Sequence, residues 1–276
     1  MKVGAGGSGL GAPGSGLGAP GWGPWPGVAA SVPVTCKSGS VGLQGPVALV
    51  GGAEWTDGCS FDAELLAASG GADVVVLPTA SAYQHPERLV MGAAEWFSSL
   101  GAQVEGLMVL GRSDAQDPGM ADVVRRARFV YLSGGSALHL RSVLKGSAVF
   151  DALREAWHGG AVVAGSGAGA MVLTDPMVDP RGGALTVGLG LVGQMAVVAN
   201  FGDVDEDAHG EKLHRSVVLA PSGLPVVGIP DRTALVGDGE GNWRVSGEGS
   251  VTVFVDGAVA SAGLGVLPGP ASVPSR

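Results

Sequence analysis

The stretch Ala164–Leu173, AGSGAGAMVL, contains the feature that decides the fold. Its composition predicts a buried strand that runs into a glycine-rich turn and then into a helix. In many α/β proteins a turn of this kind carries a nucleophile or binds a phosphate. The residue at the middle of this turn is Gly167, which has no side chain. Whether this turn carries a nucleophile or binds a phosphate therefore depends on the other segments of the chain.

Strand-like and helix-like segments alternate on the N-terminal side of this turn. Short apolar runs typical of buried strands are PVALVGG, ADVVVLPTAS, QVEGLMVL and RFVYLSGG. Helical patterns follow them in SFDAELLAASGG, HPERLVMGAAEWFSSLG and GMADVVRRA, and residues 136–160 are expected to form two helices that split at Gly146. This alternation predicts an α/β three-layer sandwich with a mainly parallel central sheet. Short strands with Gly/Asp turns after residue 223 predict extra C-terminal β-strands.

Three of the predicted strands end in glycine-rich segments: VGGAE, LSGGS and AGSGAGA. The carboxyl ends of parallel strands meet at one edge of a sheet, where α/β proteins bind their ligands. We therefore expect a pocket at this edge. The expected pocket residues are Gly134, Gly135, Ser136, Ser166 and Ala168.

Composition excludes several classes of partner. The formal net charge is −9 with only 16 Lys+Arg, which argues against nucleic acid. No apolar run approaches the ~18–20 residues of a membrane helix. Cys36 and Cys59 form neither a disulfide framework nor a metal-ligand spacing, so no metal and no cofactor are expected. The start of the chain lacks a signal-peptide core, which predicts a cytoplasmic location.

The chain is expected to divide into three parts. Residues 1–44 contain GSGLGAP twice in tandem and predict a flexible Gly/Pro-rich arm. Residues 45–262 are expected to form one α/β domain. Residues 263–276 are rich in Gly, Pro and Ser and predict a loose tail.

A dinucleotide-binding turn is one interpretation of the opening stretch. Gly165, Gly167 and Ala170 fit G-x-G-x-x-[G/A] after a strand. The helix of such a motif is long, yet Pro176 follows after a few residues, and proline rarely lies inside a helix. No acidic residue stands at the spacing that a ribose hydroxyl requires.

A nucleophile elbow is the second interpretation, because the small neighbours of Gly167 suit a tight, strained turn. Here the segment AVVAGSGAGAMVL resembles the elbow of the cyanophycinase and dipeptidase E group, the S51 serine peptidases of the class I glutamine amidotransferase-like fold. Their elbow reads G-[T/W/F]-S-A-G-A. The segments VALVGGAE, VVVLPTAS, FVYLSGGSALHL and GIPDRTALVGDGEGNWRVSGEGSVTVFVDG resemble other family segments in the same order. The resemblance spans about residues 46–260.

The resemblance implies a Ser–His–Glu-type triad, and this chain departs from it at each position that can be aligned. Gly167 stands at the nucleophile position, Asn200 at the base position and Asp231 near the acid position. Ala137 replaces a family glutamine. Backbone N–H groups of Gly135 and Ala168 are the oxyanion-binding candidates that the resemblance implies. Glycine carries no nucleophile and asparagine takes no proton at neutral pH, so we expect hydrolysis to be lost or strongly impaired.

A third interpretation keeps catalysis by moving the nucleophile to Ser166, with His209 or His214 as base and Glu206, Asp207 or Glu211 as its orienting acid. Cys59 is a further candidate nucleophile, for which a buried apolar role is simpler. Three functions follow from these readings. The first is an inactive homologue that binds a small peptide-like ligand or a partner such as an active relative. The second is a hydrolase of aspartyl or β-aspartyl peptides. The third is a structural or homo-oligomer-forming subunit.

Overall fold

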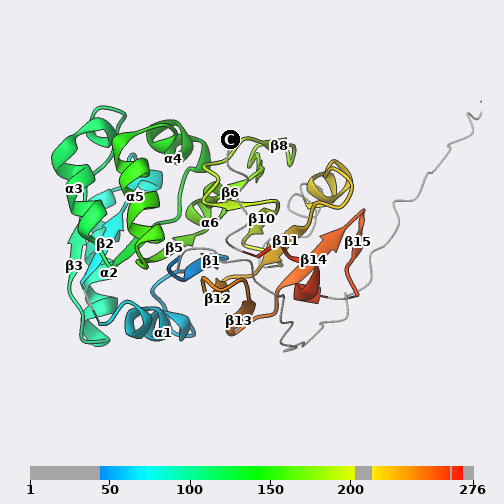
Figure 1. Ribbon diagram of the computed structural model, residues 1–276, viewed down its shortest axis with the longest axis horizontal. Coiled ribbons are helices and arrows are strands. Elements are labelled where there is room, and N and C mark those ends of the chain that lie inside the picture. Colours follow the sequence, from blue (N-terminus) through cyan, green and yellow to red (C-terminus); the bar gives the residue numbers. More distant parts are fainter. Residues whose placement is uncertain (1–43, 72, 203–212, 262, 270–276) are drawn as a thin grey trace, which may run out of the picture.

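A seven-stranded sheet forms the centre of the protein (Figure 1). The computed structural model describes residues 44–71, 73–202, 213–261 and 263–269. The sheet order is β13-β12-β1-β5-β4-β2-β3. Its strands are β1 (Val47–Val50), β2 (Val74–Leu77), β3 (Val104–Gly106), β4 (Phe129–Leu132), β5 (Val162–Ser166), β12 (Thr233–Gly237) and β13 (Trp243–Gly247). Strands β1 to β5 are parallel, and β12 and β13 are antiparallel additions. The mainly parallel sheet and the extra C-terminal strands predicted from the sequence are confirmed.

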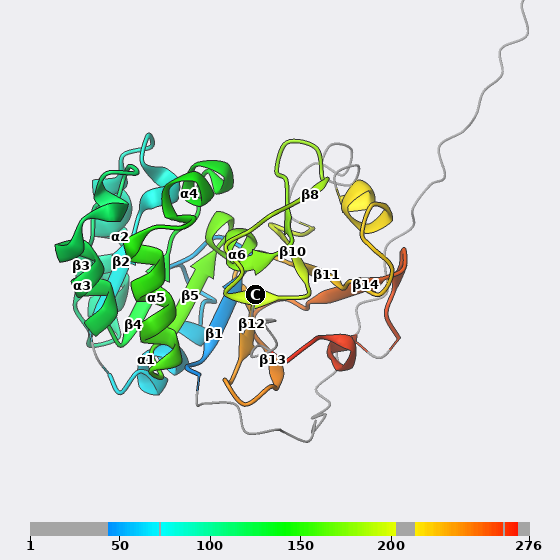
Figure 2. The same ribbon diagram turned by 45° about the horizontal axis from the view of Figure 1, so that its top comes forward.

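Helices cover both faces of this sheet (Figure 2). Successive strand residues point to opposite faces, so Leu49 and Leu132 pack with the α3–α6 side while Val50 and Tyr131 pack with the α1–α2 side. Both faces are buried, which explains why the strands are continuous apolar runs. The α-helices around this sheet are α1 (Phe61–Ala68), α2 (Pro86–Ser99), α3 (Pro118–Arg126), α4 (Ala137–Leu144), α5 (Ala148–His158) and α6 (Ala168–Leu173). Residues 213–218 are also helical. Short 3₁₀ segments are η1 (Thr79–Ser81), η2 (Asp114–Gln116) and η3 (Gly263–Val266).

The break between α4 and α5 follows from local chemistry. Gly146 lies between them with φ of 61°, a conformation that glycine adopts without a Cβ penalty. The hydroxyl of Ser136 accepts a hydrogen bond from the His139 N–H at the start of α4, and that of Ser147 accepts from the Phe150 N–H in α5. The predicted split at Gly146 is confirmed.

A second sheet lies beside the first and has the order β10-β11-β14-β15. Its strands are β10 (Ala196–Ala199), β11 (Val226–Ile229), β14 (Thr252–Val255) and β15 (Ala258–Val259). Two small pairs, β6 (Thr174–Asp175) with β9 (Val192–Gly193) and β7 (Met177–Val178) with β8 (Leu185–Thr186), connect α6 to it. Strands β10 and β11 are parallel neighbours, so the residues that follow them lie side by side. The chain returns to the central sheet between β11 and β12.

The structure describes only part of the two chain ends. Residues 1–43 of the expected arm and residues 270–276 of the expected tail lie outside the described residues. In the described part of the tail, Leu264 and Leu267 pack against the core, and Pro268 O accepts a hydrogen bond from Trp243 Nε1 at 2.8 Å. Among the described ranges, each helix is too short or too polar to cross a bilayer.

Candidate functional site

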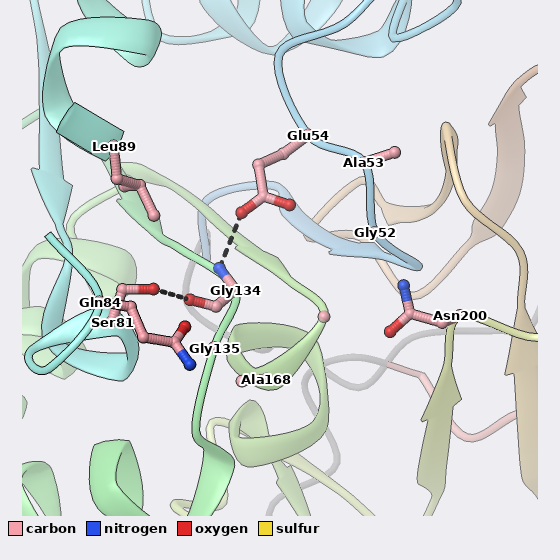
Figure 3. A pocket seen from close by; sticks show the side chains of 11 residues that line it. Gly52, Ala53, Glu54, Ser81, Gln84, Leu89, Gly134, Gly135, Ala168 and Asn200 are labelled. Atoms are coloured by element: carbon pink, nitrogen blue, oxygen red, sulfur yellow. Dashed lines mark hydrogen bonds between the residues drawn. The ribbon is translucent and has the colours of Figure 1, made fainter. Parts of the chain in front are cut away.

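A pocket of about 330 Å³ lies at the carboxyl edge of the central sheet (Figure 3). The parallel pairing of β5 with both β1 and β4 brings the three glycine-rich strand ends together. Residues from all three ends line the pocket, together with residues from the η1–α2 region and from the loop after β10. The lining residues are Gly52, Ala53, Glu54, Ser81, Gln84, Leu89, Gly134, Gly135, Gly167, Ala168 and Asn200.

Gly167 lies at the tip of the turn between β5 and α6. Its φ of 51° and ψ of −108° form a sharp backbone turn that side-chain-bearing residues adopt only with strain. A Cβ placed there would meet only Gly134 Cα, at 3.6 Å, so the space above the tip is open toward the pocket. The flanking Gly165 and Gly169 permit close packing: a Cβ on Gly169 would lie 2.5 Å from the Leu132 carbonyl oxygen. The turn thus has the shape of a nucleophile elbow without a nucleophile at its tip.

The helix after the turn is short. Helix α6 ends at Leu173, and Thr174 already belongs to β6. A dinucleotide pyrophosphate requires a long helix behind the glycine turn, so the geometry gives no support to the interpretation based on Gly165, Gly167 and Ala170.

Asn200 and Asp231 form a hydrogen-bonded pair on one wall of the pocket. Each follows the carboxyl end of one of the parallel neighbours β10 and β11. Asn200 Nδ2 donates to Asp231 Oδ1 at 2.6 Å, and the Asn200 N–H donates to the Gly51 carbonyl at 2.9 Å. A Cβ on Gly52 would lie 2.1 Å from Asn200 Nδ2, so glycine is required for this close approach. The structure therefore brings together the three positions that the resemblance aligned with a triad: Gly167, Asn200 and Asp231.

The hydroxyl of Ser166, the displaced nucleophile candidate, is directed toward Glu54. Its side chain is fully buried, and its hydroxyl donates to Glu54 Oε2 at 2.7 Å. Ser166 is absent from the pocket lining. The hydrogen-bond partner of the Ser166 hydroxyl is therefore a carboxylate and not His214. His209 and the acidic residues Glu206, Asp207 and Glu211 lie outside the described residues.

Glu54 is the side chain that sequence reasoning missed. Its Oε1 accepts a hydrogen bond from the Gly134 N–H at 2.8 Å while Oε2 accepts from Ser166, so the carboxylate connects the β1, β4 and β5 ends. Figure 3 shows Glu54 reaching from its loop toward Gly134. An acidic residue two positions after a pair of glycines at a predicted strand end is the signal that could have identified it.

The loop that holds Glu54 is strained on both sides. Ala53 and Trp55 adopt left-handed φ values of 49° and 59°, which cost free energy for residues with a Cβ. Contacts hold this conformation: Thr56 Oγ1 donates to the Ala53 carbonyl at 2.7 Å, and the Trp55 ring packs on Tyr131 with centroids 5.2 Å apart. Backbone strain that the surroundings maintain is common at functional sites.

The remaining residues expected at the pocket have different roles. Gly135 and Ala168 line it, whereas Ser136 caps α4 and is not part of the lining. Ala137, where the family has glutamine, is buried at the start of α4. Gln84, from the segment before α2, supplies an amide to the pocket that the sequence had not indicated.

Cys59, the other candidate nucleophile, is absent from the pocket lining, and so is His139 of α4. Cys59 is buried, its thiol donates to the Ala53 carbonyl at 3.5 Å, and burial raises the pKa of the thiol, so the reactive thiolate is disfavoured. His139 Nε2 hydrogen-bonds the Leu110 carbonyl at 2.9 Å. Within the described ranges, no group of three or more His, Cys, Asp or Glu side chains is arranged to hold a metal ion.

A buried acid lies behind the Glu54 loop. Asp62 Oδ2 accepts a hydrogen bond from Trp96 Nε1 at 2.9 Å, but Asp62 Oδ1 and the Tyr131 hydroxyl have no partner among the described residues. Burial raises the pKa of the Asp62 carboxyl to about 8, the Trp96 bond opposes this, and the charge of Glu54 adds to it. Asp62 is therefore protonated through much of the neutral range.

The fold and the turn geometry define a class of α/β proteins with a mainly parallel central sheet and a sharp strand–turn–helix element at its carboxyl edge. The sequence profile of Peptidase family S51 matches residues 48–243, and the chain belongs to this family. The resemblance to S51 peptidases stated from the sequence is confirmed.

Individual relatives agree with this assignment. A cyanophycinase of Synechococcus elongatus is 29% identical over 220 residues, covering 77% of this chain and 68% of the relative. A cyanophycinase of Geminocystis herdmanii is 25% identical, covering 79% of this chain and 83% of the relative.

Solved structures extend the comparison to three dimensions. A peptidase from an acI-B1 Actinobacterium matches with a TM-score of 0.70 and 26% identity, covering 79% of this chain and 94% of that one. A putative peptidase E protein from Listeria monocytogenes matches with a TM-score of 0.55 and 17% identity, over 75% of this chain and 98% of the other, which supports the fold alone.

Proposed function

We propose that this S51 family member has lost hydrolysis, or retains it only strongly impaired, and uses its pocket to bind a small peptide-like ligand. The observation that carries the proposal is Gly167: the elbow tip faces the pocket and carries no side chain. Acyl transfer in a serine peptidase requires a hydroxyl at that tip, because the covalent intermediate forms on it.

The neighbouring wall supports the same proposal. The Asn200 amide donates to Asp231 and has no basic nitrogen with which to accept a proton from a nucleophile. Loss of a single triad member lowers turnover by several orders of magnitude, and loss of two leaves little beyond binding.

The chemistry of the lining favours a peptide-like ligand. Backbone from Gly135 and Ala168 and the side-chain amides of Gln84 and Asn200 are groups that pair with peptide N–H and C=O groups. The family resemblance makes aspartyl and β-aspartyl peptides the first candidates. A partner chain, including an active relative, is the other expected occupant. The cytoplasmic location stays a prediction from the sequence.

Fluorophosphonate labelling read by intact mass and peptide mapping tests the loss of catalysis. Wild type runs beside the triple variant Gly167→Ser, Asn200→His, Asp231→Glu, and beside the matched double variant Asn200→His, Asp231→Glu. We expect label only on the triple variant, at position 167. An unlabelled triple variant would contradict the alignment of these positions with a triad, and labelled wild type would contradict inactivity. A thermal shift of wild type with aspartyl peptides tests ligand binding.

A hydrolase with Ser166 as displaced nucleophile is the second candidate. One contact favours it: the Ser166 hydroxyl lies 2.7 Å from a carboxylate oxygen of Glu54, which could accept its proton. The full burial of Ser166 opposes it, because a scissile carbonyl would have no path to the hydroxyl. Label on Ser166 in wild type would establish this candidate. The third role, a structural or homo-oligomer-forming subunit, depends on the arm outside the described residues and stays a prediction.

A further inference from the structure

We propose that Glu54 binds a positively charged nitrogen of the ligand, a protonated amine or a guanidinium. This inference rests on the proposed function and adds the chemical group that the pocket selects. Three features of Glu54 carry it: the free acceptor capacity of its carboxylate, the absence of an ion-pair partner among the described residues, and the rigidity of its loop.

The carboxylate keeps acceptor capacity after its internal bonds are made. Oε1 accepts from the Gly134 N–H at 2.8 Å and Oε2 from the Ser166 hydroxyl at 2.7 Å. A carboxylate offers about four lone-pair sites, so about two remain. Glu54 is only partly buried and belongs to the pocket lining, so these sites are open to a bound ligand.

Among the described residues, the charge of Glu54 has no counterion. None of the residues that line the pocket is Lys, Arg or His. In the described part of the chain, Glu54 takes part in no ion pair at 4.0 Å or less. Asp231 adds a second acid beside the pocket, and the chain carries a net charge of −9. A partly desolvated anion without a counterion gains free energy when a cation binds.

The position of the carboxylate is fixed before a ligand arrives. The left-handed residues Ala53 and Trp55 on either side of Glu54 are held by hydrogen bonds and ring packing, as described above. A Cβ at Gly134 would lie 3.0 Å from Glu54 Oε1, so glycine allows this approach of the carboxylate to the β4 end. A preorganised group does not pay the entropy of ordering on binding, which favours its use in recognition.

The test measures dissociation constants by calorimetry for two matched pairs of peptides. Aspartyl-alanine against N-acetyl-aspartyl-alanine tests the α-amino group as the source of the cation. N-acetyl-aspartyl-arginine against N-acetyl-aspartyl-citrulline tests a guanidinium. Each pair is measured with wild type, with the near-isosteric variant Glu54→Gln, and with Glu95→Gln, which removes a charge from the exposed face of α2. Thermal unfolding of each variant verifies that it is folded.

We expect the charged member of at least one pair to bind wild type and Glu95→Gln at least about tenfold more tightly, and this preference to vanish in Glu54→Gln. Binding without preference in wild type would overturn the inference and leave the proposed function intact. A preference that survives in Glu54→Gln would do the same. If no peptide binds wild type, peptide binding as the proposed function fails, and this inference fails with it.

Discussion

Glu54 and Ser166 are joined by a 2.7 Å hydrogen bond across the sequence, from the end of β5 to the loop after β1. The bond occupies the only hydroxyl of the elbow segment, residues 164–173, which is fully buried, while its neighbour Gly167 presents no side chain. The residues around the turn therefore position a carboxylate in the pocket, and not a hydroxyl.

Ser166→Ala should lower the free energy of unfolding by about 1–3 kcal/mol, because it removes a buried donor to a charged acceptor. Thermal or urea unfolding measures this. Ser99→Ala, whose exposed hydroxyl donates only to the Trp96 carbonyl at 2.6 Å, is the matched control and should change stability by less than about 0.5 kcal/mol. Equal effects in the two variants would show that the Ser166 bond contributes nothing specific.

Gly167→Ala should destabilise the protein by about 1–3 kcal/mol although space is available for a methyl group, because the cost lies in the backbone conformation. For a folded part of this size, that corresponds to a decrease in Tm of roughly 2–12 °C. The control Gly92→Ala lies inside α2 with nothing within 4 Å of its added Cβ, and should stabilise by about 0.5–1 kcal/mol. An unchanged Tm for Gly167→Ala would mean that the turn relaxes.

Asp62 should make the protein less stable as the pH rises from about 4 to about 8. Its folded-state pKa of about 8 lies above the ordinary value of 3.8, so the folded chain holds the extra proton across this window. Free energy of unfolding then falls with pH, with a slope of at most about 1.4 kcal/mol per pH unit, and the loss is complete above the folded-state pKa.

Asp62→Asn removes this contribution and keeps an acceptor for Trp96 Nε1. Urea unfolding across pH 5–9 should therefore show a flatter profile for Asp62→Asn than for wild type, and higher stability at pH 9. The exposed Asp73→Asn is the control and should follow wild type. Parallel profiles for wild type and Asp62→Asn would mean that the carboxyl titrates with an ordinary pKa.

Asn200→Asp should place two carboxylates where an amide now donates at 2.6 Å to Asp231. Repulsion at this partly solvent-screened position should lower the free energy of unfolding by about 1 kcal/mol at pH 7. Most of the lost stability should be regained near pH 4, when a carboxyl is protonated. Asn200→Ala, which removes the bond without adding charge, separates the two effects because its stability deficit should not depend on pH. A pH-independent deficit in Asn200→Asp would argue against close contact.

The sequence predicted the architecture well because the fold depends on features that are local in the chain. Apolar runs mark β1, β2, β4 and β5, and a proline marks the start of α2. The weakest prediction was the segment QVEGLMVL, of which only Val104–Gly106 forms a strand. That strand lies at the edge of the sheet, where fewer neighbours stabilise the extended conformation.

The site was predictable in part. Gly167 could be read from the turn itself, and Asn200 and Asp231 only from the family resemblance, since their pairing depends on the register of β10 and β11. The acid after the glycine pair could have marked Glu54 as a candidate, but the direction of its side chain was not predictable, because it is set by left-handed backbone at Ala53 and Trp55, residue types that rarely adopt it. The partner of Ser166 was unpredictable for the same reason.

The pocket lies at the junction of the two sheets. Glu54, Gly134 and Gly167 belong to loops of the seven-stranded sheet, whereas Asn200 follows a strand of the four-stranded one. A ligand that contacts both walls would act as a clasp between them, so that separating the sheets would require its release. Ligand binding would then affect regions far from the pocket, because the two sheets would unfold together in a single, sharper transition.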